Sequence, residues 1–234
     1  FSLTVPEGQF LSIVGGNGSG KTTLLNILCG SVPIDRGEVR IAGRNVEKMQ
    51  DYRRYAMMGR VYQDPSMGTC PSLTVLENLS LADNKGRRYG LRRGVERKRI
   101  DAYRQMLAEL GLGLEGKLNV KMGSLSGGQR QALALLMATM TPLKFLILDE
   151  HTAALDPKTA AGIMELTDRI VRKKKLTALM VTHNLRYALD YGDRLLMLDR
   201  GKILLDRTGA EKAATSPEDI LSVFQRADMG LGFC

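Results

Sequence analysis

The sequence predicts an α/β fold in which helices cover a mostly parallel sheet and a helical insertion interrupts the order of the strands. Strand-like segments alternate with helix-like segments along the chain, which is the pattern of a parallel sheet. Residues 144–150 and 176–183 are apolar runs without polar alternation, and such runs are typical of strands buried on both faces. The stretch from 66 to 141 has instead helical periodicity and many charges.

The first half of the chain predicts three strands and one helix. Residues 8–16 (GQFLSIVGG) indicate a buried strand that ends in glycines, and a helix is expected over residues 21–29, with the next glycine as its stop signal. Residues 37–43 alternate between apolar and polar side chains and are flanked by turn glycines, which predicts a second strand. Residues 55–64 (YAMMGRVYQD) are strand-like and run into a loop.

The second half predicts a long helix, a hairpin and a terminal helix. Residues 157–175 form an amphipathic pattern with proline in the first turn, a favoured position for it. Residues 193–206 predict a hairpin around Arg200-Gly201, and residues 216–226 a last helix that begins with a cap.

Length and composition indicate a single globular domain. The chain has 234 residues, 44% of them hydrophobic and 25% charged, and no apolar run approaches the roughly 18 residues that span a membrane. The N-terminus lacks the basic and apolar regions of a secretory signal. Three widely spaced cysteines form no disulfide or metal pattern, which favours the cytosol.

The net charge of +9 is concentrated in one segment. Residues 85–104 hold nine Lys or Arg against two acidic residues, a net +7 that leaves +2 for the rest of the chain. Two interpretations stay open. The segment is either a solvated helix face or a patch for an anionic partner, such as a membrane surface, nucleic acid or an acidic protein loop.

A phosphate-binding loop is predicted at residues 15–22 (GGNGSGKT), which fit the pattern GxxxxGK(S/T) between a strand and a helix. Its glycines let backbone N–H groups surround phosphate oxygens at a helix N-terminus. Lys21 would reach the β- and γ-phosphates of a nucleotide and the Thr22 hydroxyl would bind Mg²⁺. The residues assigned to ATP binding here are Gly15, Gly16, Asn17, Gly18, Ser19, Gly20, Lys21, Thr22 and Thr23.

Two carboxylates follow the apolar strand at residues 144–150. In an open α/β sheet, ligands bind at the carboxyl ends of the strands, where Asp149 and Glu150 are expected. Asp149 would contact the magnesium shell, and Glu150 would position a water in line with the γ-phosphate. Taken alone, the pair would also fit two exposed carboxylates that close a strand.

The order of the remaining motifs resembles the nucleotide-binding subunits of ATP-binding cassette (ABC) transporters. Gln63 in VYQDP resembles the Q-loop of that family, and LSGGQ at 125–129 matches its signature letter for letter. AALD at 153–156 resembles the D-loop, and His183 in VTHN resembles the switch histidine. LSGGQ between a glutamine loop and an ILDE strand is highly specific, and the resemblance covers nearly the whole chain.

The resemblance implies a site shared by two subunits that pair head to tail, with ATP between them. A partner's LSGGQ segment would cap the γ-phosphate from the other side, and a helix N-terminus without side-chain bulk suits that role. Asp156 is expected at the dimer interface, and His151 stands where many members have proline. The residues implied are Lys21, Gln63, Glu150 and His183 for catalysis, Thr22, Gln63 and Asp149 for the metal, and Ser126, Gly127, Gly128 and Gln129 for the partner's ATP.

The resemblance also implies domain limits and partners. We expect one ABC ATPase domain over residues 1–234, with a core at 1–64 and 142–234 and a helical subdomain at about 65–141. The family's N-terminal antiparallel strands, with the aromatic that stacks on adenine, are expected to be partly missing, because that segment would precede Phe1.

The implied cofactors are ATP and Mg²⁺. The implied partners are a second nucleotide-binding subunit, membrane permease subunits and a substrate-binding protein, with no direct contact to nucleic acid. The expected location is cytoplasmic, peripheral on the inner face of the cell membrane. The expected function is that of a subunit in an importer of a small solute such as an amino acid. The alternative is a stand-alone ABC-type ATPase that acts on nucleic-acid or protein assemblies.

Overall fold

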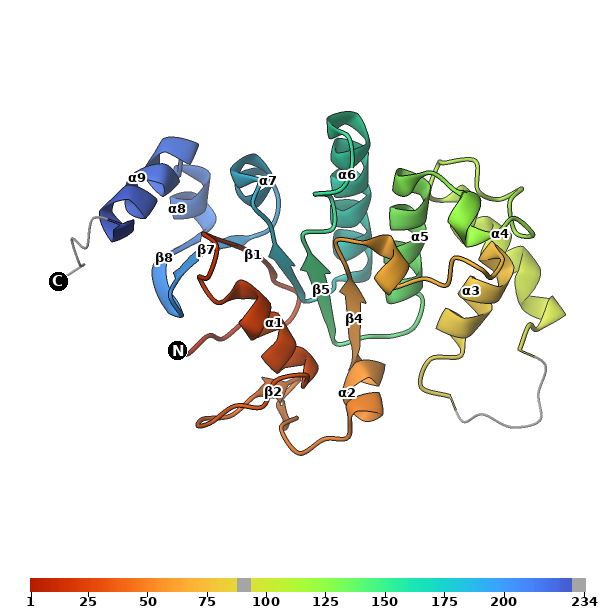
Figure 1. Cartoon of the computed structure of the whole chain (residues 1–234), viewed down its shortest axis with the longest axis horizontal. Helices are drawn as coiled ribbons and strands as arrows, with labels where there is room; N and C mark the ends of the chain where they lie inside the picture. Colours follow the sequence, from red (N-terminus) through yellow and green to blue (C-terminus); the bar gives the residue numbers. More distant parts are fainter. Residues whose placement is uncertain (88–93, 229–234) are drawn as a thin grey trace.

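The computed structural model describes residues 1–87 and 94–228, and a six-stranded sheet forms its centre (Figure 1). The strand order is β4-β5-β6-β1-β7-β8, and all neighbours are parallel except β7 and β8. The short β2 and β3 form a separate antiparallel pair. The strands are β1 (Phe10–Gly15), β2 (Arg40–Ile41), β3 (Arg44–Asn45), β4 (Met58–Val61), β5 (Phe145–Asp149), β6 (Ala178–Val181), β7 (Arg194–Asp199) and β8 (Lys202–Thr208).

Helices cover both faces of this sheet. The helices are α1 (Lys21–Cys29), α2 (Asp51–Met57), α3 (Val75–Asp83), α4 (Ile100–Ala108), α5 (Gly127–Thr139), α6 (Pro157–Lys174), α7 (Leu185–Asp190), α8 (Gly209–Ala213) and α9 (Pro217–Asp228). None of those formed by the described residues is both long and apolar enough to cross a membrane.

The uninterrupted apolar strands are explained by two separate cores. Along β5, Phe145 and Ile147 belong to a core with α1, whereas Leu146 and Leu148 belong to a core with α5 and α6. Successive side chains of a strand point to opposite faces, so a strand between two helix layers needs apolar residues at every position. The α/β fold with a mostly parallel sheet is confirmed.

Between β4 and β5 the chain leaves the sheet and forms α3, α4 and α5, at the end of the molecule opposite α8 and α9 (Figure 1). Thr74 and Glu77 form a capping box that starts α3, with Glu77 N donating to Thr74 Oγ1 at 3.2 Å. Tyr103 of α4 is buried and donates its hydroxyl to Asp83 Oδ2 of α3 at 3.0 Å. Part of the basic segment, residues 88–93, lies outside the described residues. The domain limits stay a prediction.

Some expected elements differ in the structure. The strand predicted over 55–64 is reduced to Met58–Val61, because its first three residues close α2. The strand predicted over 37–43 is reduced to Arg40–Ile41. Helices α2, α7 and α8 were not predicted, because each spans seven residues or fewer and is too short for a clear helical period.

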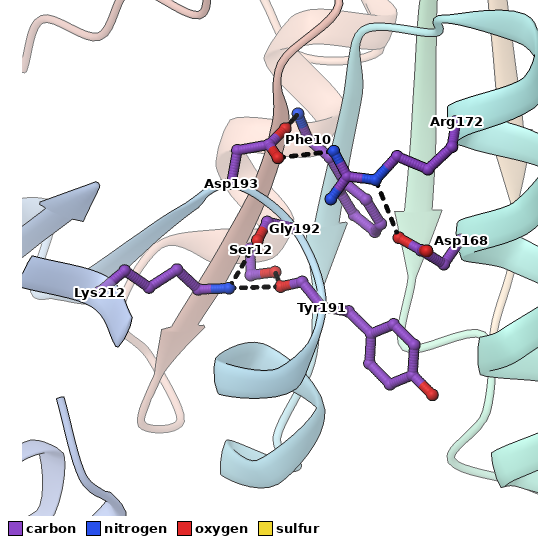
Figure 2. Close-up of polar contacts among 8 residues, drawn as sticks. All are labelled: Phe10, Ser12, Asp168, Arg172, Tyr191, Gly192, Asp193 and Lys212. Atoms are coloured by element: carbon purple, nitrogen blue, oxygen red, sulfur yellow. Dashed lines mark hydrogen bonds and ion pairs between the residues drawn. The ribbon is translucent and has the colours of Figure 1, made fainter. Parts of the chain in front are cut away.

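The amino-terminal edge of the sheet is closed by polar contacts within the chain (Figure 2). Asp193, just before β7, accepts a hydrogen bond from Phe10 N at 2.8 Å and one from Arg172 Nη1 at 2.6 Å. Lys212 of α8 donates to the carbonyl oxygens of Tyr191 and Gly192, both at 2.7 Å. These contacts join β1, β7, α6 and α8, and they lie at the end of the strands away from the predicted site.

Candidate functional site

Four neighbouring parallel strands deliver predicted site residues to one edge of the sheet. The phosphate loop follows β1, His183 follows β6, Asp149 and Glu150 end β5, and Gln63 follows β4. Val181 is in register with both Ile13 on β1 and Asp149 on β5, so the ends of these strands lie level. This is the carboxyl edge, where ligands of open α/β sheets bind.

The phosphate loop has the backbone that its glycines predict. Gly20 immediately precedes α1 and has φ of +102°, a conformation that residues with side chains rarely adopt. Asn17 and Gly18 are exposed, as are Thr22 and Thr23 in the first turn of α1. The loop therefore presents backbone amides, two hydroxyls and a helix N-terminus to an anion.

Lys21 is the buried cation of this loop, with 6% of its surface exposed. Its Nζ donates to the carbonyl oxygens of Gly15 and Gly16, both at 2.8 Å, and to Ser19 Oγ at 3.2 Å. Burial lowers the pKa of Lys21, and the nearby Glu150 carboxylate opposes that effect. All three acceptors are neutral, so an anionic phosphate oxygen would be a stronger acceptor for the same ammonium.

Asp149 is paired with Arg60, a residue that the sequence analysis did not single out. Arg60 Nη2 lies 2.7 Å from Asp149 Oδ2, across the β4–β5 pair. Burial is the largest single influence and lowers the pKa of Arg60, but the hydrogen bond to Asp149 and the charge interactions with Cys29, Asp149 and Tyr62 together raise it above its usual value. The only available signal was one charged side chain inside the otherwise uncharged strand MGRV.

Glu150 and His183 are in direct contact. His183 Nε2 lies 2.6 Å from Glu150 Oε1, with 49% of the histidine side chain and 20% of the glutamate side chain exposed. Glu150 has φ of +47°, which is unusual for a residue with a side chain and is common at functional sites. Its amide N–H donates to Val181 O at 2.9 Å, so the strained residue is anchored to β6.

Gln63 is exposed on the loop after β4. It lines an open hollow of about 520 Å³ together with Asp149, Gly127 and Arg130. The same loop is joined to α5, because Gln131 Nε2 donates to the carbonyl oxygen of the residue before Gln63 at 3.0 Å. The glutamine loop thus lies between the Asp149 carboxylate and the start of α5.

The LSGGQ segment forms the N-terminus of α5. Ser126 is the N-cap and accepts from Gln129 N at 3.3 Å, and the Gln129 side chain reaches back to Ser126 N. Gln129 Nε2 also donates to Leu112 O at 3.2 Å, so the Gln129 side chain already makes hydrogen bonds within its own chain. A Cβ atom at Gly128 would lie 2.3 Å from Thr159 Cγ2 of α6, a packing reason for glycine that the sequence did not reveal.

Asp156 and His151 both belong to the DEHTAALD segment at residues 149–156. Asp156 is exposed and caps α6, accepting from Thr159 N at 3.0 Å, and hydrogen bonding from the side chain and then the backbone of Thr159 lowers the pKa of Asp156. His151 is buried, and its Nε2 lies 3.0 Å from Thr167 Oγ1. Desolvation lowers the pKa of His151 to about 4, so it is neutral at pH 7.

The structure brings Lys21, Asp149, Glu150 and His183 to one edge of the sheet, but it does not bring residues 126–129 to the phosphate loop. Within residues 1–87 and 94–228, no hydrogen bond or ion pair joins these two segments. In one copy of the chain the LSGGQ segment is therefore not bonded to the phosphate loop within the described residues, although Gly127 lines the same hollow as Gln63 and Asp149.

A sequence profile of the family described as ABC transporter matches residues 1–153. That span contains the phosphate loop, Gln63, the LSGGQ segment and both carboxylates. The chain belongs to the ABC transporter family. The family resemblance in the sequence is confirmed.

This ABC transporter chain is 47% identical over 226 residues to the tyrosine transport ATP-binding protein of Clostridioides difficile (strain R20291), covering 97% of this chain and 90% of the relative. It is 31% identical to the xylose/arabinose import ATP-binding protein XylG of Sulfolobus acidocaldarius, covering 99% and 90%. It is 34% identical to the thiamine import ATP-binding protein ThiQ of Jannaschia sp. (strain CCS1), covering 93% and 90%.

Solved ABC cassettes share the fold. A dimeric cassette in a post-hydrolysis state with bound ADP and Pi has a TM-score of 0.72 and 33% identity, covering 88% of each chain. A cassette in its ADP conformation has a TM-score of 0.77 and 26% identity, covering 100% of this chain and 91% of that one. The chain is therefore an ATP-binding and ATP-hydrolysing subunit of an ABC transporter.

Proposed function

We propose that two copies of this chain pair head to tail and hydrolyse Mg²⁺-bound ATP in shared sites, and that this hydrolysis powers import of a small solute. The observation that carries the proposal is the division of the site. Lys21, Asp149 and Glu150 gather at one edge of the sheet, while Ser126 at the start of α5 has no described contact with the phosphate loop. A second copy would supply the missing half.

Each group at the carboxyl edge has a chemical role in this proposal. Lys21 exchanges its neutral acceptors for β- and γ-phosphate oxygens and stabilises the charge that develops on them. Glu150 orients the attacking water and accepts its proton, and the 2.6 Å contact with His183 fixes the position of that carboxylate. His183 is half exposed, so it can also reach a phosphate oxygen.

The side chains near the phosphate loop suit Mg²⁺. Thr22, Gln63 and Asp149 offer a hydroxyl, an amide oxygen and a carboxylate, which are the hard oxygen donors that this ion prefers. No group of three or more His, Cys, Asp or Glu that could hold a metal occurs in the described part of the chain. A single carboxylate fits an ion that binds mainly through substrate phosphates, and Mg²⁺ would neutralise charge on those phosphates.

The proposed cargo class rests on the relatives. One relative, 47% identical, is an ATP-binding protein whose name specifies tyrosine transport, and others are named for import of sugars, thiamine and methionine. We therefore favour an importer of an amino acid, with permease subunits and a substrate-binding protein as partners and the chain on the inner face of the membrane. These names support transport over the stand-alone ATPase that the sequence left open.

Replacing Glu150 with Gln tests the shared site. The variant keeps the shape of the side chain but loses the group that takes the water proton, so bound ATP should persist between two subunits. A ligand that binds only the dimer stabilises it by mass action. In size-exclusion chromatography, E150Q should elute as a monomer without nucleotide and as a dimer with millimolar-scale ATP and Mg²⁺, well above usual affinities.

A second substitution supplies the control for head-to-tail pairing. Adding Ser126→Arg places a bulky side chain where the partner's γ-phosphate would lie, so the ATP-dependent shift should disappear. Persistent dimers in the double variant would contradict the role of LSGGQ, and normal hydrolysis by E150Q would contradict the role of Glu150.

A further inference from the structure

Arg60 is a partly buried cation inside the proposed site, and none of the roles assigned above involves it. Its side chain is 13% exposed, and its guanidinium bonds to Asp149 at 2.7 Å. On its other side, Nη1 lies 3.4 Å from Asn26 Oδ1 and 3.6 Å from Cys29 Sγ, both on the helix that follows the phosphate loop. The guanidinium also lies 4.7 Å from the ring centre of Tyr62, next to Gln63.

Asp149 is the ion-pair partner of Arg60. Among the described residues, Asp149 is the only carboxylate within ion-pair distance of Arg60, and the buried Arg60 Nε has no hydrogen-bond partner. A buried cation with one carboxylate is strongly tied to it, because leaving either charge unpaired is costly. The pair links the carboxylate proposed for the metal to the helix of the phosphate loop.

We propose that Arg60 is a resident counter-cation of Asp149 with which metal-bound nucleotide competes, so that Arg60 sets how strongly nucleotide binding depends on Mg²⁺. This inference rests on the metal role proposed for Asp149. Two cations drawn to one partly buried carboxylate repel each other, with less screening than in water. Without metal, the same guanidinium offsets the Asp149 charge next to the polyphosphate and favours binding of free nucleotide.

The ratio of two dissociation constants tests this role without measuring hydrolysis. The probe is the non-hydrolysable analogue AMP-PNP, titrated by calorimetry in EDTA and in Mg²⁺. In Arg60→Met, the dissociation constant of AMP-PNP in EDTA should rise, while its dissociation constant in Mg²⁺ should stay level or fall. The ratio of the EDTA constant to the Mg²⁺ constant should then increase about tenfold, the effect expected for one hydrogen bond to a charged group.

Three variants separate charge from packing. Arg60→Lys keeps the charge, so its ratio should stay near that of the unmodified chain. Arg54→Met removes another buried guanidinium, which bonds to the carbonyl oxygens of Val46 and Ile27 and has no ion-pair partner among the described residues. It should change stability without changing the ratio. If Arg60→Met does not fold, as judged by circular dichroism, Arg60→Gln removes the charge and keeps a donor for Asp149.

The outcomes are distinct. Parallel changes in both constants, with an unchanged ratio, would overturn the inference and leave Arg60 a structural residue. A lower ratio would also overturn it, because Arg60 would then be orienting Asp149 for the metal. If the unmodified chain bound AMP-PNP equally in EDTA and Mg²⁺, the metal role of Asp149 in the proposed function would fail instead.

Discussion

Lys21 and Lys212 make nearly the same contacts at opposite edges of one sheet. Each is 6% exposed, each donates from Nζ to two consecutive carbonyl oxygens, and burial lowers the pKa of each. Burial and bonding to carbonyl oxygens therefore do not distinguish a ligand-binding lysine from a structural one. The difference lies in what surrounds the acceptors.

Around Lys212 the polar groups satisfy one another. The Tyr191 carbonyl also accepts from Ser12 Oγ, and the adjoining Asp193 is bonded to Phe10 N and Arg172 (Figure 2). Around Lys21 the acceptors belong to a loop whose next residues, Asn17 and Gly18, are exposed. At the carboxyl edge a ligand can replace the acceptors of Lys21. At the amino edge the polar groups around Lys212 are bonded to one another within the chain.

The largest expected effect comes from replacing each lysine by methionine. Lys21→Met should lower the rate of ATP hydrolysis at least about 100-fold, because the cation at the β- and γ-phosphates is lost. Lys212→Met removes the ammonium that donates to the Tyr191 and Gly192 carbonyl oxygens and should lower the free energy of unfolding by about 1–3 kcal/mol. The measurements are phosphate release at saturating ATP and urea denaturation.

The two variants serve as controls for each other. Lys212→Met should hydrolyse ATP at close to the normal rate per folded molecule, since Lys212 lies at the far edge. Equal losses of hydrolysis in both variants would remove the distinction between the two edges.

The sequence predicted the strands and loops of the site well because each motif carries local signals. Glycines, Lys21 and Thr22 define a phosphate loop whatever the surrounding fold, and an apolar run before Asp149 predicts a strand end. The sequence could not predict which of these side chains meet. The Glu150–His183 contact depends on β5 and β6 being neighbours, and the Arg60–Asp149 pair depends on β4 lying beside β5.

His151 belongs to a site motif by sequence, yet like Lys212 it is buried and its polar contact lies within the chain. Thr167 Oγ1 donates to Ile163 O at 2.7 Å, so it accepts from His151 Nε2, which places the hydrogen of the neutral imidazole on Nε2. The pKa of His151 is about 4 in the folded chain, against 6.5 for an ordinary histidine. Between these pH values the unfolded chain binds a proton that the folded chain does not. The contribution of His151 to the free energy of unfolding is therefore fully present above pH 6.5 and is lost as the pH drops toward 4.

His151→Gln keeps a donor for Thr167 and removes the titration. From pH 7.5 to 5.0, the unmodified chain should lose about 2 kcal/mol more of its unfolding free energy than His151→Gln. Urea denaturation of both proteins at the two pH values measures this difference. Parallel pH profiles would mean that His151 accepts a proton in the folded state.

The smallest expected effect on stability concerns Gly128, which has both a packing contact within the chain and a proposed role in binding the partner's ATP. Alanine would place Cβ 2.3 Å from Thr159 Cγ2, and relief of such a clash costs about 1–3 kcal/mol, partly offset by the better helix propensity of alanine. Gly128→Ala should therefore lose about 1 kcal/mol of unfolding free energy. Adding Thr159→Ser removes Cγ2 and should restore stability, as measured by urea denaturation.

Hydrolysis by the same double variant separates the two reasons for this glycine. If Gly128 also faces the partner's ATP, the added methyl group still blocks the approach of the γ-phosphate after the clash with Thr159 is removed. Gly128→Ala/Thr159→Ser should then be as stable as Thr159→Ser alone, yet hydrolyse ATP more slowly. Equal rates in these two variants would mean that glycine at position 128 is required only for packing against α6. Its role would then be structural, like that of Lys212.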